Sequence, residues 1–188
     1  MQLWVTPSLT KSLDPSTTLQ LEVSGRLRSD VDGGDLIQAR LGIDRAIGSG
    51  FSVGLGVYAV ESREDERRLQ QQVTFSRGIF RARTRLEQRF FEGAPRTAWR
   101  LRQRIGIEVP LKGGRWSVLG SVEPFWTLRD STPGGQTGLT TLRLIGGVER
   151  EVGPHTSLSV AYLNQRTIVR DGPDRIAHIP QVGIAFRY

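Results

Sequence analysis

The chain has 188 residues, of which 37% are hydrophobic, and this length predicts a single domain spanning residues 1–188. It contains no cysteine and only two histidines, which excludes disulfides, thiolate metal sites and a cysteine nucleophile, so we expect no cofactor and no metal. The formal net charge of +7 rests almost wholly on arginine, because Lys11 and Lys112 are the only lysines.

Apolar and polar residues alternate with a period of two along almost the whole chain, which is typical of β-strands. No apolar run approaches the ~18 residues of a membrane-spanning helix. Eleven candidate strands follow, in chain order, near residues 3–13, 19–27, 37–43, 51–59, 73–75, 80–90, 99–109, 116–126, 142–148, 158–162 and 182–188. Met1 is followed directly by the first of them, so we expect a mature chain without a signal peptide.

Turn signals between these strands alternate between tight and loose connections. Tight turns are indicated at Asp14-Pro15, Gly48 to Gly50, Arg77-Gly78, Lys112 to Gly114 and Gly153-Pro154. Longer polar connections fall at residues 29–35, 61–66, 92–96, 129–138 and 170–175. The pattern predicts an all-β, antiparallel up-and-down meander.

The polar faces of the strands are rich in arginine and glutamate. The inward-facing charge network that we expect comprises Arg81, Arg83, Arg85, Glu87, Arg89, Arg100, Arg102, Arg104, Glu108, Glu123, Arg143 and Glu149. Glu22 and Asp44 are further carboxylates on these faces. In a soluble sandwich such faces meet water, whereas in a transmembrane β-barrel they line the lumen and the apolar faces meet lipid.

Four features favour the transmembrane barrel. Aromatic side chains fall near strand ends on the apolar faces, as in interfacial girdles: Trp99, Trp116, Trp126, Phe186 and Tyr188. Tilted segments of about ten residues match the height of a hydrocarbon layer. Glycine is frequent on the polar faces, where it leaves room for arginine. Finally, Tyr188 ends an alternating strand, which resembles the C-terminal signal read by the barrel assembly machinery.

Several segments carry a family resemblance: Trp4, residues 83–90 (RTRLEQRF), residues 99–104 (WRLRQR), Pro110-Leu111, residues 121–125 (SVEPF), and the closing hairpin from residues 162–165 (YLNQ) to Tyr188. With these the sequence resembles a family of uncharacterised Gram-negative outer-membrane barrels, catalogued as a domain of unknown function. The resemblance covers nearly the whole chain. It implies a fold and a bacterial outer-membrane location but supplies no catalytic residues.

The strand count conflicts with a general rule. Bacterial single-chain barrels have an even number of strands, whereas eleven candidates are found here. Either one segment is split wrongly, or the first is not a regular wall strand, or one strand escapes the pattern. We therefore expect 10 to 12 strands, with Tyr188 and the tight turns on the periplasmic side and the long loops outside.

The residues are compatible with four functions. The arginine and glutamate faces favour either a salt-bridge network filling the lumen or a narrow, anion-preferring path, both without catalysis. His155 and Ser157 share one strand face and resemble the pair of a lipid A deacylase, with Glu149 or Glu151 to orient the histidine. A soluble lipocalin-like binding barrel would instead bury the tryptophans.

The expected partners follow from the barrel. They are outer-membrane lipids and lipopolysaccharide, together with the assembly machinery acting on the C-terminal strand. Nucleic-acid binding is disfavoured, because the arginines alternate with lipid-type residues instead of forming one convex basic patch.

Overall fold

The computed structural model describes residues 2–29, 34–62 and 65–188. In this part of the chain eleven strands form one closed barrel. They are β1 (Gln2–Ser12), β2 (Thr17–Arg28), β3 (Leu36–Gly48), β4 (Phe51–Glu61), β5 (Glu66–Arg77), β6 (Phe80–Phe91), β7 (Ala98–Pro110), β8 (Trp116–Arg129), β9 (Gly138–Glu151), β10 (Thr156–Thr167) and β11 (Arg175–Arg187). None of the described segments is a helix long and apolar enough to cross a membrane.

The strands follow one another around the barrel in sequence order, and each consecutive pair is antiparallel. The all-β barrel and its strand number, predicted as 10 to 12, are confirmed. None of the three explanations offered for the odd strand count holds in the described barrel. The first segment is a regular wall strand that pairs on both sides, so the described barrel has an odd number of strands. Consequently β1 and β11 run parallel, with Thr6 opposite Gly183.

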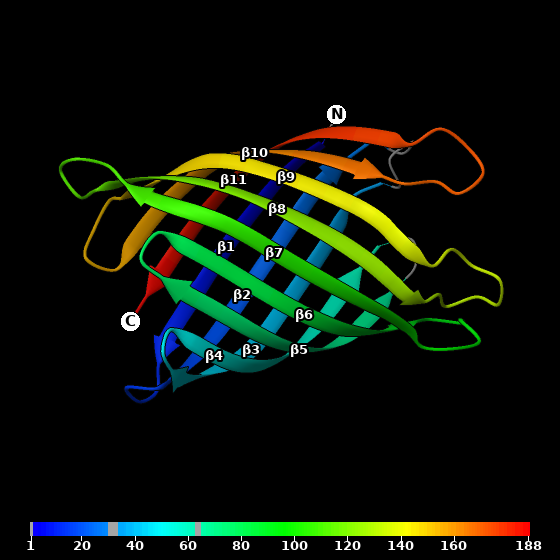
Figure 1. Ribbon diagram of the computed structural model, residues 1–188, viewed down its shortest axis with the longest axis horizontal. Helices are drawn as coiled ribbons and strands as arrows, with labels where there is room; N and C mark the ends of the chain where they lie inside the picture. The colour runs from blue at the N-terminus through cyan, green and yellow to red at the C-terminus, as the bar shows by residue number, and fades with distance from the viewer. Residues whose placement is uncertain (1, 30–33, 63–64) are drawn as a thin grey trace.

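The two ends of the barrel differ. The tight turns all lie at one end, together with Tyr188, whose backbone is hydrogen-bonded to Thr10 and Ser12. The longer loops lie at the opposite end, and the two ends are clearly separated along the barrel axis (Figure 1). Residues 30–33 and 63–64, which belong to two of the predicted long connections, lie outside the described residues. We call these ends the turn end and the loop end.

The faces of the strands settle the choice between sandwich and barrel. Apolar side chains point outward around the whole wall, as Leu55, Ile105 and Val160 do with 55%, 54% and 59% exposure. The polar faces point inward, where Arg85 and Glu87 are buried. The soluble lipocalin-like alternative required Arg81 to Arg89 to face water and is therefore wrong.

Small apolar clusters also occur inside the barrel. Trp4, Leu163 and Ile179 form one, and Leu36, Tyr58 and Val60 form another. Both lie in the half of the lumen nearer to the loop end, because their positions are close to the strand ends on that side. These groups narrow the lumen between the charged side chains.

Candidate functional site: an arginine-lined lumen

The arginines of β6 and β7 face the lumen and stand directly opposite one another. Arg83 pairs in register with Arg104, and Arg85 with Arg102. Like charges at such separations repel, so a neutralising group beside at least one member of each pair is favourable. The lumen supplies carboxylates and amides on the neighbouring strands.

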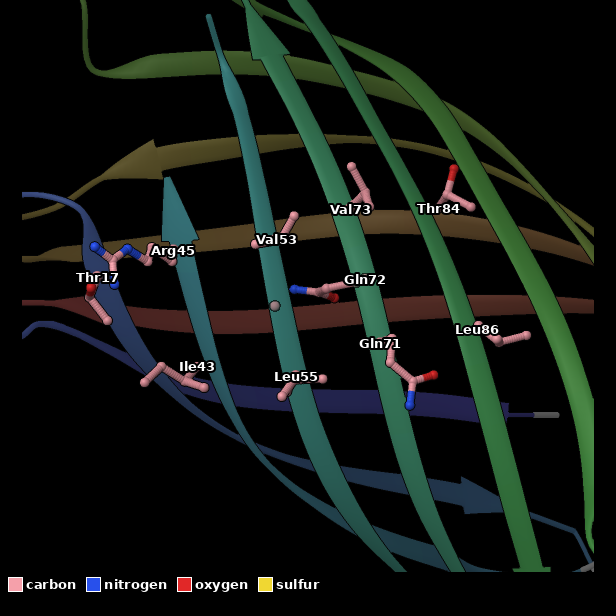
Figure 2. Close-up of a pocket in the computed structure, with 11 residues that line it drawn as sticks. Thr17, Ile43, Arg45, Val53, Leu55, Gln71, Gln72, Val73, Thr84 and Leu86 are labelled. Carbon is pink, nitrogen blue, oxygen red and sulfur yellow. The ribbon is translucent and has the colours of Figure 1, made fainter. Parts of the chain in front are cut away.

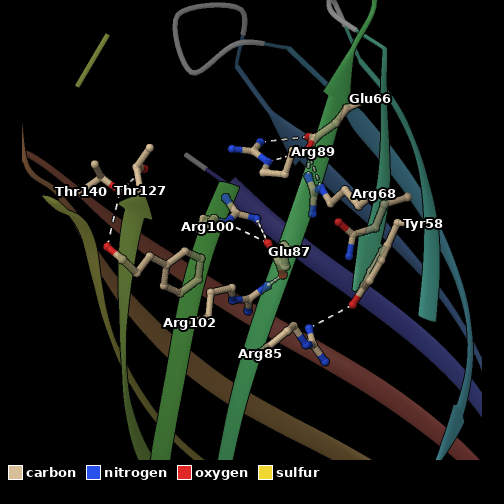
Figure 3. Close-up of polar contacts among 12 residues, drawn as sticks. Tyr58, Glu66, Arg68, Arg85, Glu87, Arg89, Arg100, Arg102, Thr127 and Thr140 are labelled. Atoms are coloured by element: carbon tan, nitrogen blue, oxygen red, sulfur yellow. Dashed lines mark hydrogen bonds and ion pairs between the residues drawn. The ribbon is translucent and has the colours of Figure 1, made fainter. Parts of the chain in front are cut away.

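Glu87 on β6 neutralises the centre of this arginine wall. Its carboxylate accepts hydrogen bonds from Arg100 Nε and Nη2 at 2.7 and 2.5 Å and from Arg102 Nη1 at 2.9 Å. The Glu87 side chain is completely buried, and the three side chains form one cluster below Arg89 in Figure 3. A carboxylate that receives two guanidinium groups in this way holds both of them in fixed positions.

Glu123 on β8 continues the network towards the turn end. Its Oε1 accepts from Arg102 Nη2 at 3.0 Å and from Arg83 Nη2 at 3.2 Å. Arg102 therefore bridges Glu87 and Glu123 across β7. The network thus joins side chains of three adjacent strands, β6, β7 and β8.

A second carboxylate cluster lies nearer to the loop end. Glu66, the first residue of β5, pairs with Arg68 at 2.6 Å and with Arg89 at 2.5 Å and is 4% exposed. We expected Glu66 in a loop, because it follows a polar run, and we did not place Arg68 in the network. The inward register of Glu66, opposite Val60 and Phe91, explains the difference.

The remaining predicted carboxylates are arranged less tightly. Glu108 pairs with Arg81, and Glu149 pairs with Arg187, both at partly exposed positions near the turn end. Asp44 accepts a hydrogen bond from Gln72 at 2.6 Å instead of an arginine. Glu22 forms no ion pair with any residue that the structure describes.

Several guanidinium groups have only neutral partners. Arg26 donates to Gln38, Arg143 to Gln165, Arg104 to Ser121, and Arg85 to Tyr58 and Gln72. No described carboxylate lies within ion-pair distance of these four arginines. Positive charge therefore exceeds negative charge in the middle of the lumen.

Aromatic rings support two of these arginines. Arg26 lies 3.9 Å from the Trp4 ring centre, and Arg143 lies between Trp4 and Phe125, at 5.0 and 4.6 Å. Such stacking stabilises a cation without neutralising it. Trp4 and Phe125 were not in the predicted network. Trp4 is two residues from Thr6, and Phe125 is two residues from Glu123, so each shares the lumen face of its strand with a polar residue. This spacing was the sequence signal that could have identified both aromatic residues.

The interior is divided into small cavities. One of about 250 Å³ is lined mainly by arginines, with two carboxylates and several small residues: Trp4, Arg26, Arg102, Arg104, Arg143, Glu22, Glu123, Ser159, Ala161 and Gly183 are among them. A second cavity of about 250 Å³ opens nearer to the loop end, around Glu66, Arg89 and Arg100. A third of about 500 Å³ lies at the turn end, around Asp14, Asp44 and Gln72. Side chains of the network stand between the first two.

The predicted girdle residues lie at the two ends of the wall. Trp99 is the second residue of β7 and Trp126 lies near the end of β8, so both are near the loop end. Trp116, Phe186 and Tyr188 are at the turn end, where Arg150 stacks on Trp116 at 5.1 Å.

His155 and Ser157 do not form the couple that a hydrolase requires. His155 lies in the turn after β9, where its ring stacks on Tyr188 at 5.1 Å. Ser157 points into the barrel, and its hydroxyl has no hydrogen-bond partner among the described residues. A lipid A deacylase would need the two residues in contact at the outer end of the barrel, where we expect the long loops, whereas both residues lie at the turn end.

A closed wall with an apolar exterior and a charged interior defines a membrane β-barrel. A family model described as a protein of unknown function (DUF2490) matches residues 1–176, and the chain belongs to this family. The resemblance stated from the sequence is thereby confirmed.

Two individual proteins are similar to the chain. An uncharacterised protein of Methylorubrum extorquens is 26% identical over 200 residues, which cover 100% of this chain and 87% of that protein. Among solved structures, the NanC porin superposes with a TM-score of 0.62 at 8% identity, covering 96% of this chain and 91% of the porin chain. This similarity is one of fold.

Proposed function

We propose that the protein is a bacterial outer-membrane barrel whose lumen binds small anions and lets them pass along a narrow path. The single observation that carries the proposal is the excess of buried guanidinium groups around the 250 Å³ cavity at Trp4, Arg26 and Arg143. Arginines with neutral partners attract carboxylate or phosphate groups more strongly than arginines that are already paired. The proposal includes no catalytic step.

Arg102 lies on the proposed path, because it lines both the central cavity and the one at the loop end, and Arg100 lines the latter. Glu87 holds both of these arginines. An entering anion would compete with the Glu87 carboxylate for Arg100 and Arg102. Conductance should therefore be small. The similarity in fold to a porin supports a permeability role in general terms.

The test is ion selectivity of the purified protein in planar lipid bilayers under a salt gradient. We expect small currents with a preference for anions, and a several-fold smaller preference in Arg143→Gln. Arg150→Gln is the matched control, because Arg150 lies on the same strand but on the outer face, beside Trp116. Cation preference in the wild type, or an equal effect of the two substitutions, would refute the proposal.

A purely structural barrel is the second candidate. The observation that favours it is the ion-pair network itself, in which Glu87 is fully enclosed by arginines. Such a lumen is filled by side chains, as in barrels of about eight strands. Complete absence of current from folded, inserted protein would select this function over the first.

We also propose the partners that an outer-membrane barrel requires. Lipids and lipopolysaccharide would surround the apolar wall between the aromatic residues at its two ends. The barrel assembly machinery would recognise the last strand, which ends at Arg187 and is followed by Tyr188. No nucleic acid is among the proposed partners.

A further inference from the structure

Three adjacent strands carry polar side chains on the outer wall. They are Gln71 on β5, Thr84 and Gln88 on β6, and Gln103 on β7, which we call the amide stripe. Thr84 stands directly opposite Gln103, and Gln71 lies one pleat from Thr84, since it is opposite Leu86. Each residue alternates with lumen-facing neighbours, so all four point away from the lumen.

The amide stripe lies at the depth where the wall is otherwise apolar. Gln71, Thr84 and Gln103 are near the middle of their strands. On other strands the outward residues near the middle are apolar: Leu21, Leu41, Val57, Leu144, Val160 and Val182. Tyr162 also faces outward there, but its hydroxyl is hydrogen-bonded to His178.

The stripe lacks hydrogen-bond partners within the chain. None of its four side chains is hydrogen-bonded to another described residue, and Gln71 Oε1 is buried without a partner. Hydrocarbon offers no donors or acceptors, so unsatisfied amides at this depth are unfavourable. Lipid alone therefore does not satisfy this part of the wall.

An apolar depression adjoins the stripe. It has a volume of about 600 Å³ and is lined by Ile43, Val53, Leu55, Val73 and Leu86, with Gln71 and Thr84 among its walls. Figure 2 shows these side chains along β3 to β6, with Gln71 between Leu55 and Leu86 and Thr84 beside Val73. The surface thus combines a concave apolar area with unpaired polar groups.

We propose that the amide stripe and this depression form the contact between two copies of the chain in the membrane. Copies inserted in the same direction are related by a two-fold axis along the membrane normal, which brings equal depths together. The amide stripe of one copy then faces the amide stripe of the other. Amides and hydroxyls both donate and accept hydrogen bonds, so the surface is complementary to its own copy. An acyl chain could fill the depression but could not pair with the amides.

The first test uses cysteine cross-linking of purified protein in liposomes. The chain has no native cysteine, so Thr84→Cys and Val160→Cys are clean single-cysteine variants. Thr84→Cys places the thiol in the stripe, and Val160→Cys is a control at the same depth on β10. We expect several-fold more disulfide-linked dimer from Thr84→Cys under mild oxidation. Equal cross-linking of the two variants would overturn the proposal.

The second test removes the polar groups. Energy transfer is measured between liposome-bound copies labelled at Pro133→Cys, in the exposed loop after β8, with and without Gln71→Leu, Thr84→Val and Gln103→Leu. We expect the triple substitution to reduce transfer to the random-collision level, while heat-modifiable gel migration shows a folded barrel. Monomeric wild type, as expected if only lipid covers the depression, would contradict the proposal, as would unchanged transfer in the variant.

Discussion

At the scale of single residues, Glu87 is the carboxylate on which the lumen charges depend most directly. It is fully buried and accepts hydrogen bonds from Arg100 and Arg102. Removing one member of a buried ion pair is strongly unfavourable, because the partner charge remains without compensation.

Glu87→Gln should therefore lower the free energy of unfolding by about 3 kcal/mol. The measurement is urea unfolding in lipid vesicles, followed by tryptophan fluorescence. Glu149→Gln is the control, since Glu149 pairs with Arg187 at the exposed rim and should lose less than about 1 kcal/mol. Similar losses in both variants would mean that the burial of Glu87 is not what matters.

Gly54 is a residue whose surroundings leave no room for a side chain. A Cβ atom there would lie 1.9 Å from Asp44 Oδ1 and 2.9 Å from the Ile43 carbonyl oxygen. Because Gly54 has no Cβ atom, Asp44 has room to accept the hydrogen bond from Gln72. The expectation that glycine leaves room on the lumen face is confirmed here.

Gly54→Val should destabilise the barrel by about 2 kcal/mol, as overpacked sites do. At Gly146, on the outer face of β9, a Cβ would meet no atom within 4 Å, so Gly146→Val should be neutral or slightly stabilising. Both are measured by the same unfolding experiment. A tolerated Gly54→Val would show that Asp44 can move away without loss.

At the scale of the elements, the turns are fixed by local hydrogen bonds. Asp14 Oδ1 accepts from the backbone of Ser16 and Thr17 and from the Ser16 hydroxyl, at 2.8 to 2.9 Å. These bonds favour the charged carboxylate and lower the pKa of Asp14 to about 2. An unfolded aspartate has a pKa of about 3.9.

The stability that Asp14 contributes should therefore be complete above about pH 4 and should disappear as the pH falls towards 2. Carboxyl titration followed by NMR should give a pKa near 2 for Asp14. Ser16→Ala should raise this pKa, because it removes the hydroxyl donor. An ordinary pKa in the wild type would contradict the role assigned to this turn.

The alternation of residue types was sufficient to predict the number of strands and their faces, but not their ends, since β5 begins at Glu66 and β11 at Arg175, well before the predicted starts at residues 73 and 182. It works because each strand has one face in lipid and one in the lumen, so residues such as Leu55 and Gly56 differ in kind. It could not predict which carboxylate meets which arginine. That depends on strand register, which sets Glu87 opposite Arg100 and Glu66 within reach of Arg89.

The aromatic residues show the limit of the same rule. Trp4 and Phe125 face the lumen and stack on arginines, although the predicted lumen network contained no aromatic residue. A pattern based on polarity places an aromatic side chain on the apolar face by default. Only the neighbours on its own strand reveal the true face.

At the scale of the whole molecule, Tyr188 at the end of the last strand contacts the segments on both sides of that strand. Tyr188 contacts His155 through its ring, and its backbone is hydrogen-bonded to β1. If the assembly machinery recognises this residue, Tyr188→Ala should reduce the amount of assembled barrel in cells several-fold. Refolding of the same variant from urea into detergent should remain close to wild type. An equal defect in both assays would indicate a structural role only.

The parallel pairing of β1 with β11 also has a consequence for the order of folding. It joins residues separated by almost the entire chain, such as Trp4 and Gln181, and contacts so distant in sequence form slowly. Parallel ladders are also slightly weaker per residue than antiparallel ones. We therefore expect the antiparallel hairpins to form first, as an open sheet, and the barrel to close last, when β1 pairs with β11. The same junction is where we expect the wall to separate first when the molecule is pulled apart or heated.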